Sequence, residues 1–185
     1  MEDAINSKTI EIKLAMNALG RRMENGDDSQ ILHWVIPENL ACAHRPLRHH
    51  PRYGGSGNNL DSSAIQLVKD WVTEIQICGI KSIISLMHDR DLRCYTSLDL
   101  NAADLLQFYK QEGLVVSHTS WEDPHHKKSS QSEKRKTYLR VRKEALAAYD
   151  TLPRPTLIQC SAGIDRSSPV AAFIYVTRHS EANAT

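Results

Sequence analysis

The chain has 185 residues and a formal net charge of +1, from 23 basic and 22 acidic side chains. Its length predicts a single domain with a sizeable core, and its balanced charge gives no indication of nucleic acid as a partner. No apolar run reaches the length of a membrane span, and no signal-peptide core begins the chain. The four cysteines have neither CxxC nor metal-ligand spacing, which favours a reduced, cytoplasmic setting over a disulfide framework.

Residues 1–29 form an expected N-terminal extension to a main domain at residues 30–185. Apolar residues in this extension recur at positions that allow an amphipathic helix: Ile5, Ile10, Ile12, Leu14, Met16 and Leu19. The helix is expected to end at Gly20 or in the polar run 24–29. We favour a helix that packs on the domain over a free partner-binding helix, because a short helix needs packing to persist.

Beyond the extension, strand and helix patterns alternate along the chain. The expected strands are 31–36, 80–87, 114–118 and 156–159, and the expected helices are 61–77, 99–112, 133–149 and 167–178. This alternation predicts an α/β fold, with a single domain and a central, mostly parallel sheet that helices flank on both faces. Ligands of such sheets bind at the carboxyl ends of the strands, where the strand 156–159 delivers Cys160.

The segment 43–57, AHRPLRHHPRYGGSG, is basic and rich in histidine and glycine. We favour a solvated loop here, because clustered surface histidines are usually only titrating surface groups. A metal site from His44, His49 and His50 is a weaker interpretation, since no acidic or cysteine partner lies nearby in the sequence. A third interpretation is a wall of a binding site that attracts anions.

The segment 157–170, LIQCSAGIDRSSPV, carries the most specific pattern of the chain. An apolar run leads to Cys160, a loop of small residues that includes Gly163 follows, and Arg166 precedes a segment that can start a helix. Such a loop can turn backbone N–H groups inward and, with the helix start, form an anion cradle. A thiolate at its base would be a nucleophile, and the guanidinium would grip two phosphate oxygens in a fork.

This pattern resembles the phosphate-binding loop of the cysteine-dependent protein tyrosine phosphatases, which is Cys-x5-Arg followed by Ser or Thr. Cys160, Arg166 and Ser167 occupy the three defining positions, and the sequence Cys-Ser-Ala-Gly is most similar to the dual-specificity branch. Weaker similarity extends over 31–46, which resembles the entry strands of small dual-specificity phosphatases. The family usually continues with one or two further helices, so the catalytic domain at 30–185 is expected to be short at its C-terminus.

Three positions of the loop bear on how closely the resemblance holds. Gln159 stands where the family usually has a histidine that helps to keep the cysteine ionised. Asp165 precedes the arginine, as in some lipid-phosphatase-like members. Ile164, however, is not the lysine that accompanies such a loop in several of those members.

The resemblance implies a role for each residue of the loop. Cys160 attacks phosphorus, Arg166 binds the phosphate oxygens, and Ser167 stabilises the thiolate as it leaves a phosphocysteine intermediate. The substrate-binding residues implied in this way are Ser161, Ala162, Gly163, Ile164, Asp165 and Arg166. The reaction needs no metal and no other cofactor.

The general acid must come from another segment. Residues 118–128, HTSWEDPHHKK, follow an expected strand and resemble the movable loop that carries the acid aspartate in this family. Asp123 is the first candidate and Glu122 the second. Asp165 is the third, because a carboxylate close to Arg166 should stay charged and donate a proton poorly.

The predicted function is hydrolysis of phosphate monoesters, phosphotyrosine and/or phosphoserine and phosphothreonine, with a phosphorylated protein as the partner. The chain lacks an evident tyrosine-rich loop, which favours a shallow site. Because Asp165 resembles the lipid-phosphatase-like members, phosphoinositides or other small phosphates are alternative substrates. The main alternative is a phosphate-binding pseudophosphatase, since Gln159 cannot replace an imidazole. A thiol redox or sulfur-transfer role is less favoured. We favour turnover, because Cys160 and Arg166 are both present.

Overall fold

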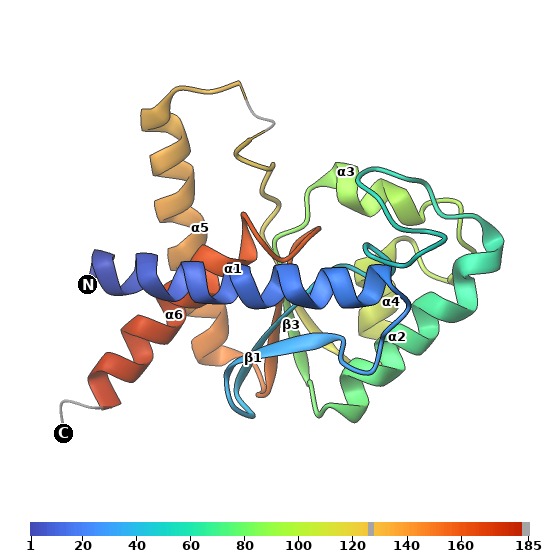
Figure 1. Ribbon diagram of the computed structural model, residues 1–185, viewed down its shortest axis with the longest axis horizontal. Coiled ribbons are helices and arrows are strands. Elements are labelled where there is room, and N and C mark those ends of the chain that lie inside the picture. The colour runs from blue at the N-terminus through green and yellow to red at the C-terminus, as the bar shows by residue number, and fades with distance from the viewer. Residues whose placement is uncertain (126–127, 183–185) are drawn as a thin grey trace.

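The computed structural model describes residues 1–125 and 128–182, and within them a five-stranded sheet lies between two layers of helices (Figure 1). The strands are β1 (Leu32–Ile36), β2 (Leu40–Ala43), β3 (Ser82–Ser85), β4 (Val115–His118) and β5 (Thr156–Gln159). Their order across the sheet is β1-β2-β5-β3-β4. Only the β1–β2 pair of these is antiparallel, so the predicted α/β fold with a mostly parallel sheet is confirmed.

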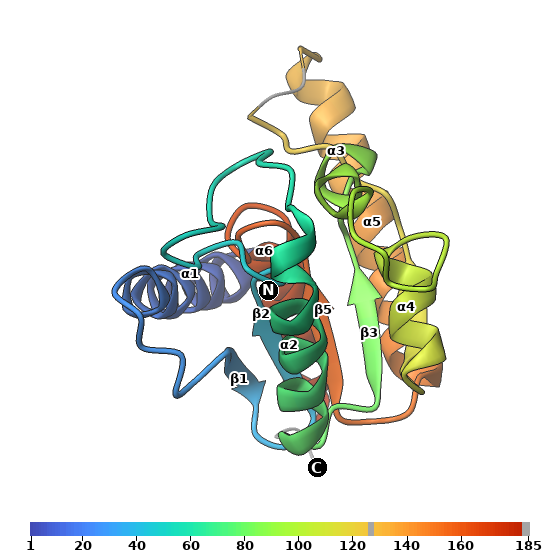
Figure 2. The same ribbon diagram turned by 90° about the vertical axis from the view of Figure 1, so that its right-hand side faces the viewer.

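The helices divide between the two faces of the sheet (Figures 1 and 2). One face carries α1 (Glu2–Glu24), α5 (Gln131–Thr151) and α6 (Ser167–Ala182), and the other carries α2 (Ile65–Ile77) and α4 (Leu105–Gln111). The rings of Trp71 and Tyr109 stack 6.0 Å apart and join α2 to α4. None of the described helices has both the length and the apolar composition needed to cross a bilayer.

The centre of the sheet is the driest part of the molecule. β3 and β5 are buried along their whole length, because helices cover both of their faces, whereas the edge strand β4 is partly exposed. Strands of this kind appear in sequence as continuous apolar runs. Ser82 and Thr156 lie opposite each other within these strands, and their hydroxyl groups hydrogen-bond to each other at 2.9 Å. The polar groups of the two strands are thereby satisfied inside the core.

Helix α1 crosses the face of the domain and joins the same core as the sheet. Its buried side chains include Ile5, Ile12, Met16, Leu19 and Met23. The helix continues through Gly20, where the ring of His49 takes the space that a side chain would need. Glu24 then accepts a hydrogen bond from His49 Nδ1 at 2.6 Å. Gly20 therefore serves helix packing in this fold rather than helix termination.

The helix expected from residue 99 begins later, at Leu105 of α4. Asn101 has a left-handed backbone with φ of 53°, which is incompatible with a continuous α-helix. The Asp104 carboxylate then accepts a hydrogen bond from Gln107 N–H at 2.8 Å and caps the helix. The short polar side chains of 99–104 thus form turns and a cap rather than a first helical turn.

Candidate active site

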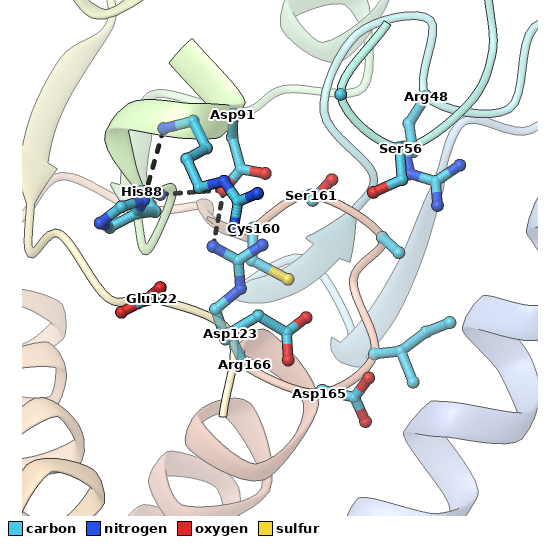
Figure 3. Close-up of a pocket in the computed structure, with 14 residues that line it drawn as sticks. Arg48, Ser56, His88, Asp91, Glu122, Asp123, Cys160, Ser161, Asp165 and Arg166 are labelled. Atoms are coloured by element: carbon cyan, nitrogen blue, oxygen red, sulfur yellow. Dashed lines mark hydrogen bonds and ion pairs between the residues drawn. The ribbon is translucent and has the colours of Figure 1, made fainter. Parts of the chain in front are cut away.

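Cys160 lies at the carboxyl end of β5, in the middle of the sheet, and the loop 160–166 connects it to α6. Its side chain is buried, and Sγ lies 3.2 Å from the Oγ of Ser167, the first residue of α6. A pocket of about 350 Å³ opens onto this loop (Figure 3). The pocket lining comprises Arg48, Ser56, Gly57, His88, Arg90, Asp91, Glu122, Asp123, Cys160, Ser161, Ala162, Ile164, Asp165 and Arg166.

Three consecutive carbonyl groups of the loop are held by donors outside it. The pairs are Ser161 O with Arg45 N–H (2.9 Å), Ala162 O with His44 Nδ1–H (2.8 Å) and Gly163 O with Ser168 Oγ–H (2.7 Å). In a planar trans peptide the C=O and the following N–H point in opposite directions. Holding three carbonyl groups away from the loop centre therefore turns three N–H groups toward it, which prepares a cradle for an anion.

His44 acts in this arrangement as a neutral donor. Burial lowers the pKa of His44 to about 3, and the nearby His49 acts in the same direction. The two rings meet edge to face, with centroids 4.3 Å apart. Because the Ala162 oxygen can only accept, the single proton of the neutral His44 ring is on Nδ1.

Gly163 is the point where α1 meets the loop. Its φ of +67° lies in the left-handed region, and a Cβ atom there would overlap the terminal methyl group of Met16. One turn earlier on α1, Lys13 Nζ lies 2.8 Å from Oδ1 of Asp165. The loop therefore needs glycine at this position for both its conformation and its packing against α1.

Gln159 replaces the expected histidine as a fully buried hydrogen-bonding residue. Its Nε2 donates to the backbone oxygen of His44 at 3.3 Å, and its Oε1 accepts from the hydroxyl group of Tyr109 at 3.1 Å. Its backbone oxygen accepts from the N–H of Leu86 at 2.7 Å. Burial raises the pKa of Tyr109, so this hydroxyl group is a neutral donor. Gln159 thus ties the base of the loop to the neighbouring strand β2 and to α4.

Arg166 is buried and points across the floor of the pocket (Figure 3). Its Nη1 donates to Asp91 Oδ2 at 2.6 Å and to the backbone oxygens of Trp121 at 3.0 Å and Leu86 at 3.3 Å. Within the described residues no hydrogen bond from the protein engages Nε or Nη2. These two nitrogen atoms form the fork that can bind two oxygens of one phosphate group.

The pair of Arg166 and Asp91 is charged on both sides. Burial opposes the charge of Arg166, but its electrostatic interactions with Cys160 and Asp91 and its hydrogen bond to Asp91 outweigh burial and raise the pKa of the guanidinium. Burial also opposes the charge of Asp91, yet the hydrogen bond and charge of Arg166 lower the pKa of that carboxyl group. An ion pair of this kind fixes the orientation of Arg166.

Sequence reasoning missed Asp91 and placed the carboxylate next to Arg166 at Asp165 instead. Asp91 belongs to the short helix α3 (Asp89–Leu92), where its Oδ2 also accepts from the N–H of His88 at 2.9 Å. The segment begins just beyond β3, at the carboxyl edge of the sheet where ligands bind. That position was the one available signal for Asp91.

All three candidate acids line the pocket. Oδ1 of Asp123 accepts a hydrogen bond from the N–H of His125 at 2.9 Å. Asp165 forms an ion pair with Lys13. Glu122 directly precedes Asp123 in the sequence. Trp121 is buried, and its ring stacks on Tyr138 of α5 with centroids 6.1 Å apart. The segment before Asp123 is thus attached to both α5 and Arg166. Residues 126 and 127 of the expected acid loop lie outside the described residues.

The histidine-rich segment 43–57 is not a solvated loop as a whole, so the favoured interpretation is wrong for its first half. His44 and Arg45 are 1% and 2% exposed, because they support the phosphate-binding loop from behind. Arg45 also donates to the hydroxyl group of Tyr95 at 3.1 Å and to Gly55 O at 3.0 Å. Further along, Arg48 and Ser56–Gly57 line the pocket, which agrees with the third interpretation, a wall of a binding site.

One trio of potential metal ligands lies among the described residues, and it involves none of the histidines of that segment. The ligand atoms of Asp123, His125 and Asp165 all lie within 4.8 Å of one another. The ammonium group of Lys13 is 2.8 Å from the same Asp165 oxygen. A cationic group of the protein is therefore already placed at this trio.

A strand–loop–helix turn places a buried cysteine and an ion-paired arginine at one pocket, which is the arrangement expected of a cysteine-dependent phosphatase. Comparison with known families agrees: the model described as Protein-tyrosine phosphatase matches residues 81–185, more than half of the chain. The chain therefore belongs to the protein-tyrosine phosphatase family and is a phosphatase of that family. A search of curated proteins found no match.

Proposed function

We propose that the chain hydrolyses phosphotyrosine and/or phosphoserine and phosphothreonine in proteins through a phosphocysteine intermediate. The observation that carries this proposal is the position of Cys160 at the base of a cradle that the fold itself holds open, next to Arg166. The described pocket lining includes no Phe, Tyr or Trp side chain that would grip a phosphotyrosine ring. This lining supports the broader substrate range of the dual-specificity branch.

In the first step the Cys160 thiolate attacks phosphorus, a P–S bond forms, and the bond from phosphorus to the leaving oxygen breaks. Asp123 transfers its proton to that oxygen, so the alcohol or phenol leaves neutral. The inward N–H groups and the fork of Arg166 stabilise the equatorial oxygens. These donors come from the loop and are oriented before the substrate binds.

In the second step the Asp123 carboxylate takes a proton from water, whose oxygen attacks phosphorus. The P–S bond breaks, inorganic phosphate forms, and the electron pair returns to the Cys160 sulfur. Ser167 Oγ, at 3.2 Å from Sγ, donates a hydrogen bond to the departing thiolate. Ser161, Ala162, Gly163, Ile164 and Asp165 complete the proposed substrate-binding loop.

Asp123 is preferred over Asp165 as the acid because of their contacts. Asp165 is held by Lys13, whereas Oδ2 of Asp123 accepts no hydrogen bond from the described residues and remains open to a leaving group. Glu122 stays the second candidate, since it also lines the pocket. The mechanism needs a reduced thiol, and all four cysteines are free, which fits the proposed cytoplasmic setting.

Hydrolysis of aryl phosphates in the presence of a chelator tests the proposal. We expect chelator-resistant turnover that falls on the order of 10⁴-fold or more in Cys160→Ser. Asp123→Asn should lose roughly 10²-fold or more with poor leaving groups and much less with good ones. Glu122→Gln and Asp165→Asn serve as matched comparisons, and the acid is the residue whose loss depends on the leaving group.

Two outcomes would contradict the mechanism. Turnover that Cys160→Ser leaves unchanged would remove the nucleophile from the proposal. A folded wild-type protein that binds vanadate without hydrolysing any aryl phosphate would instead show a phosphate-binding module. Unfolding curves of each variant, measured in urea, establish that a loss of turnover is not a loss of fold.

A further inference from the structure

The side chain of Arg48 lines the pocket and has no hydrogen-bond or ion-pair partner in the described part of the chain. Its side chain is half-buried, its Nε is buried without a hydrogen bond, and no ion pair links it to a carboxylate of the described residues. Burial, followed by the positive charge of Arg45, lowers the pKa of the Arg48 guanidinium. Glu24 and Asp91 oppose this effect from a distance, but neither carboxylate forms an ion pair with Arg48. A partly desolvated cation without a direct partner costs free energy, which an anionic ligand would recover.

The other buried arginines of the site differ from Arg48 in this respect. Arg166 is paired with Asp91, and Arg45 donates to Ser161, Tyr95 and Gly55. The protein therefore satisfies the arginines that build the cradle but not Arg48. Arg90 also lines the pocket, but it is exposed to solvent, whereas Arg48 is half-buried. An unsatisfied polar group of this kind calls for a specific explanation.

The backbone holds Arg48 in a fixed turn. Its N–H donates to Arg45 O at 3.1 Å, and its carbonyl oxygen accepts from Gly55 N–H at 3.1 Å. Leu47, immediately before it, is buried with a left-handed φ of 60°, an uncommon conformation for a leucine. The backbone that carries Arg48 therefore needs no further ordering when the side chain binds an anion.

The charge around the pocket is unequal on its sides (Figure 3). Arg48 and Ser56 lie together on one side of Cys160, while Glu122 lies on the other, and Asp123 and Asp165 add two more carboxylates to the lining. A small ligand with phosphates all around, such as a polyphosphorylated inositol, would meet these carboxylates. A ligand with one further anion directed toward Arg48 would avoid them.

We propose that Arg48 is a second anion-binding position of this pocket, which selects phosphopeptides with a carboxylate or a second phosphate beside the scissile phosphate. The proposal rests on the proposed function, because it assumes that the scissile phosphate sits over Cys160. It adds the substrate class. The anionic group of the phosphopeptide faces the side of the pocket that residues 48–57 form, and neutral or basic residues of the peptide face Glu122 and Asp123.

The test compares three peptides of equal length: phosphotyrosine next to Gln, next to Glu, and next to a second phosphorylated residue. We expect the wild type to prefer an anionic neighbour by about tenfold in kcat/KM, as a charge-assisted hydrogen bond allows. Arg48→Gln should remove this preference, so the measured quantity is the ratio of kcat/KM for each anionic peptide to kcat/KM for the Gln peptide. The matched control is Arg52→Gln, an exposed arginine of the same segment outside the pocket lining, which should keep the preference.

The two anionic peptides distinguish a carboxylate site from a phosphate site, and a preference for either one supports the proposal. An equal loss on all three peptides in Arg48→Gln would overturn it, since Arg48 would then act only on the charge of Cys160. Faster turnover of an inositol bisphosphate than of every peptide would overturn the peptide assignment.

Binding separates this proposal from the proposed function. Fluorescence anisotropy with Cys160→Ser and with Cys160→Ser/Arg48→Gln measures affinity for the same peptides without turnover. An affinity preference for the anionic peptides that disappears with Arg48 supports the second anion position even if the wild type hydrolyses none of them. Equal affinities for all three peptides in Cys160→Ser would overturn it.

Discussion

The phosphate-binding loop, residues 160–166, and the segment that carries the proposed acid, residues 119–125, meet at one pocket but are held differently. Three carbonyl groups of the phosphate-binding loop are fixed by hydrogen bonds from His44, Arg45 and Ser168. The acid segment is attached chiefly through Trp121, which contacts Arg166 and Tyr138. The fold therefore presets the binding of the phosphate, while the delivery of the proton depends on a separately attached segment.

This difference teaches where a substitution should act. A change in the supports of the phosphate-binding loop should weaken binding of any phosphate, whatever its leaving group. A change in the acid segment should matter only when the leaving group needs a proton. Arg166 belongs to the first region and contacts the second, because its Nη1 donates to the Trp121 carbonyl group. The same nitrogen atom binds Asp91, which lies outside both regions.

Among the residues that support the two regions, the largest effect should come from Asp91→Asn, which weakens the ion pair that orients Arg166. The pair is mostly buried, with side-chain exposures of 4% for Arg166 and 15% for Asp91. Removing one charge leaves the other uncompensated, so we expect a loss of about 3 kcal/mol in the free energy of unfolding. kcat/KM should fall by roughly 10²-fold for good and poor leaving groups alike.

Urea unfolding and vanadate binding check this expectation. Asp89→Asn, at an exposed position of the same helix, is the matched control and should change both quantities little. Unchanged vanadate affinity in a folded Asp91→Asn protein would show that Asp91 does not position Arg166.

A smaller effect is expected for His44, which supports only the phosphate-binding loop. His44→Ala removes the donor to Ala162 O, and kcat/KM should fall about tenfold by the same factor for good and poor leaving groups. In His44→Asn the side-chain amide can donate from a similar place, so this variant should recover part of the loss. A loss that depends on the leaving group would place His44 with the acid segment instead, and equal activity of the two variants would argue against the hydrogen bond.

The smallest expected effect is a dependence of stability on pH. The pKa of His44 is about 3 in the folded protein, against an ordinary value of 6.5, so between these values the unfolded chain binds the additional proton. Stability should therefore fall as the pH drops below about 6.5, by about 1.4 kcal/mol at pH 5.5 from His44 alone. Burial also lowers the pKa of His49, which acts in the same direction.

Urea unfolding of the wild type and of His44→Asn at pH 7.5 and 5.5 measures this contribution. The free energy of unfolding should change less between the two pH values in the variant, because one titrating group has been removed. An equal change in the free energy of unfolding in both proteins would mean that the pKa of His44 is not lowered in the folded state.

The sequence predicts the parts of this site that lie within one segment. Cys160, Arg166 and Ser167 are linked by a loop whose spacing sets their geometry, and the run of strands and helices sets the fold class. The supports could not be predicted, because they depend on the order of strands. β5 lies between β2 and β3, which brings the segments after those strands, with His44 and Asp91, to either side of the loop. No local pattern encodes that neighbourhood.

The same reason explains two weaker parts of the sequence analysis. The histidine-rich segment was read by its composition, which indicates a surface, although its place after β2 buries its first residues. The helix was expected to end at Gly20 or in the polar run 24–29, and it ends at Glu24. The alternative at Gly20 is wrong, because this glycine serves close packing inside the helix. Each residue type has a common local role, and contacts distant in sequence override it here.

The position of β2 also shows that the segment matched by the family model and the segment that supports the site begin at different residues. The segment that matches the family, 81–185, contains every residue of the proposed chemistry. One of the two strands that pair with β5, β2, lies before this segment, and so do the donors at His44 and Arg45. A fragment cut at residue 81 would keep the reactive groups and lose part of the frame that orients them. The part of the chain that the family model matches is therefore shorter than the part that supports the proposed phosphate-binding loop.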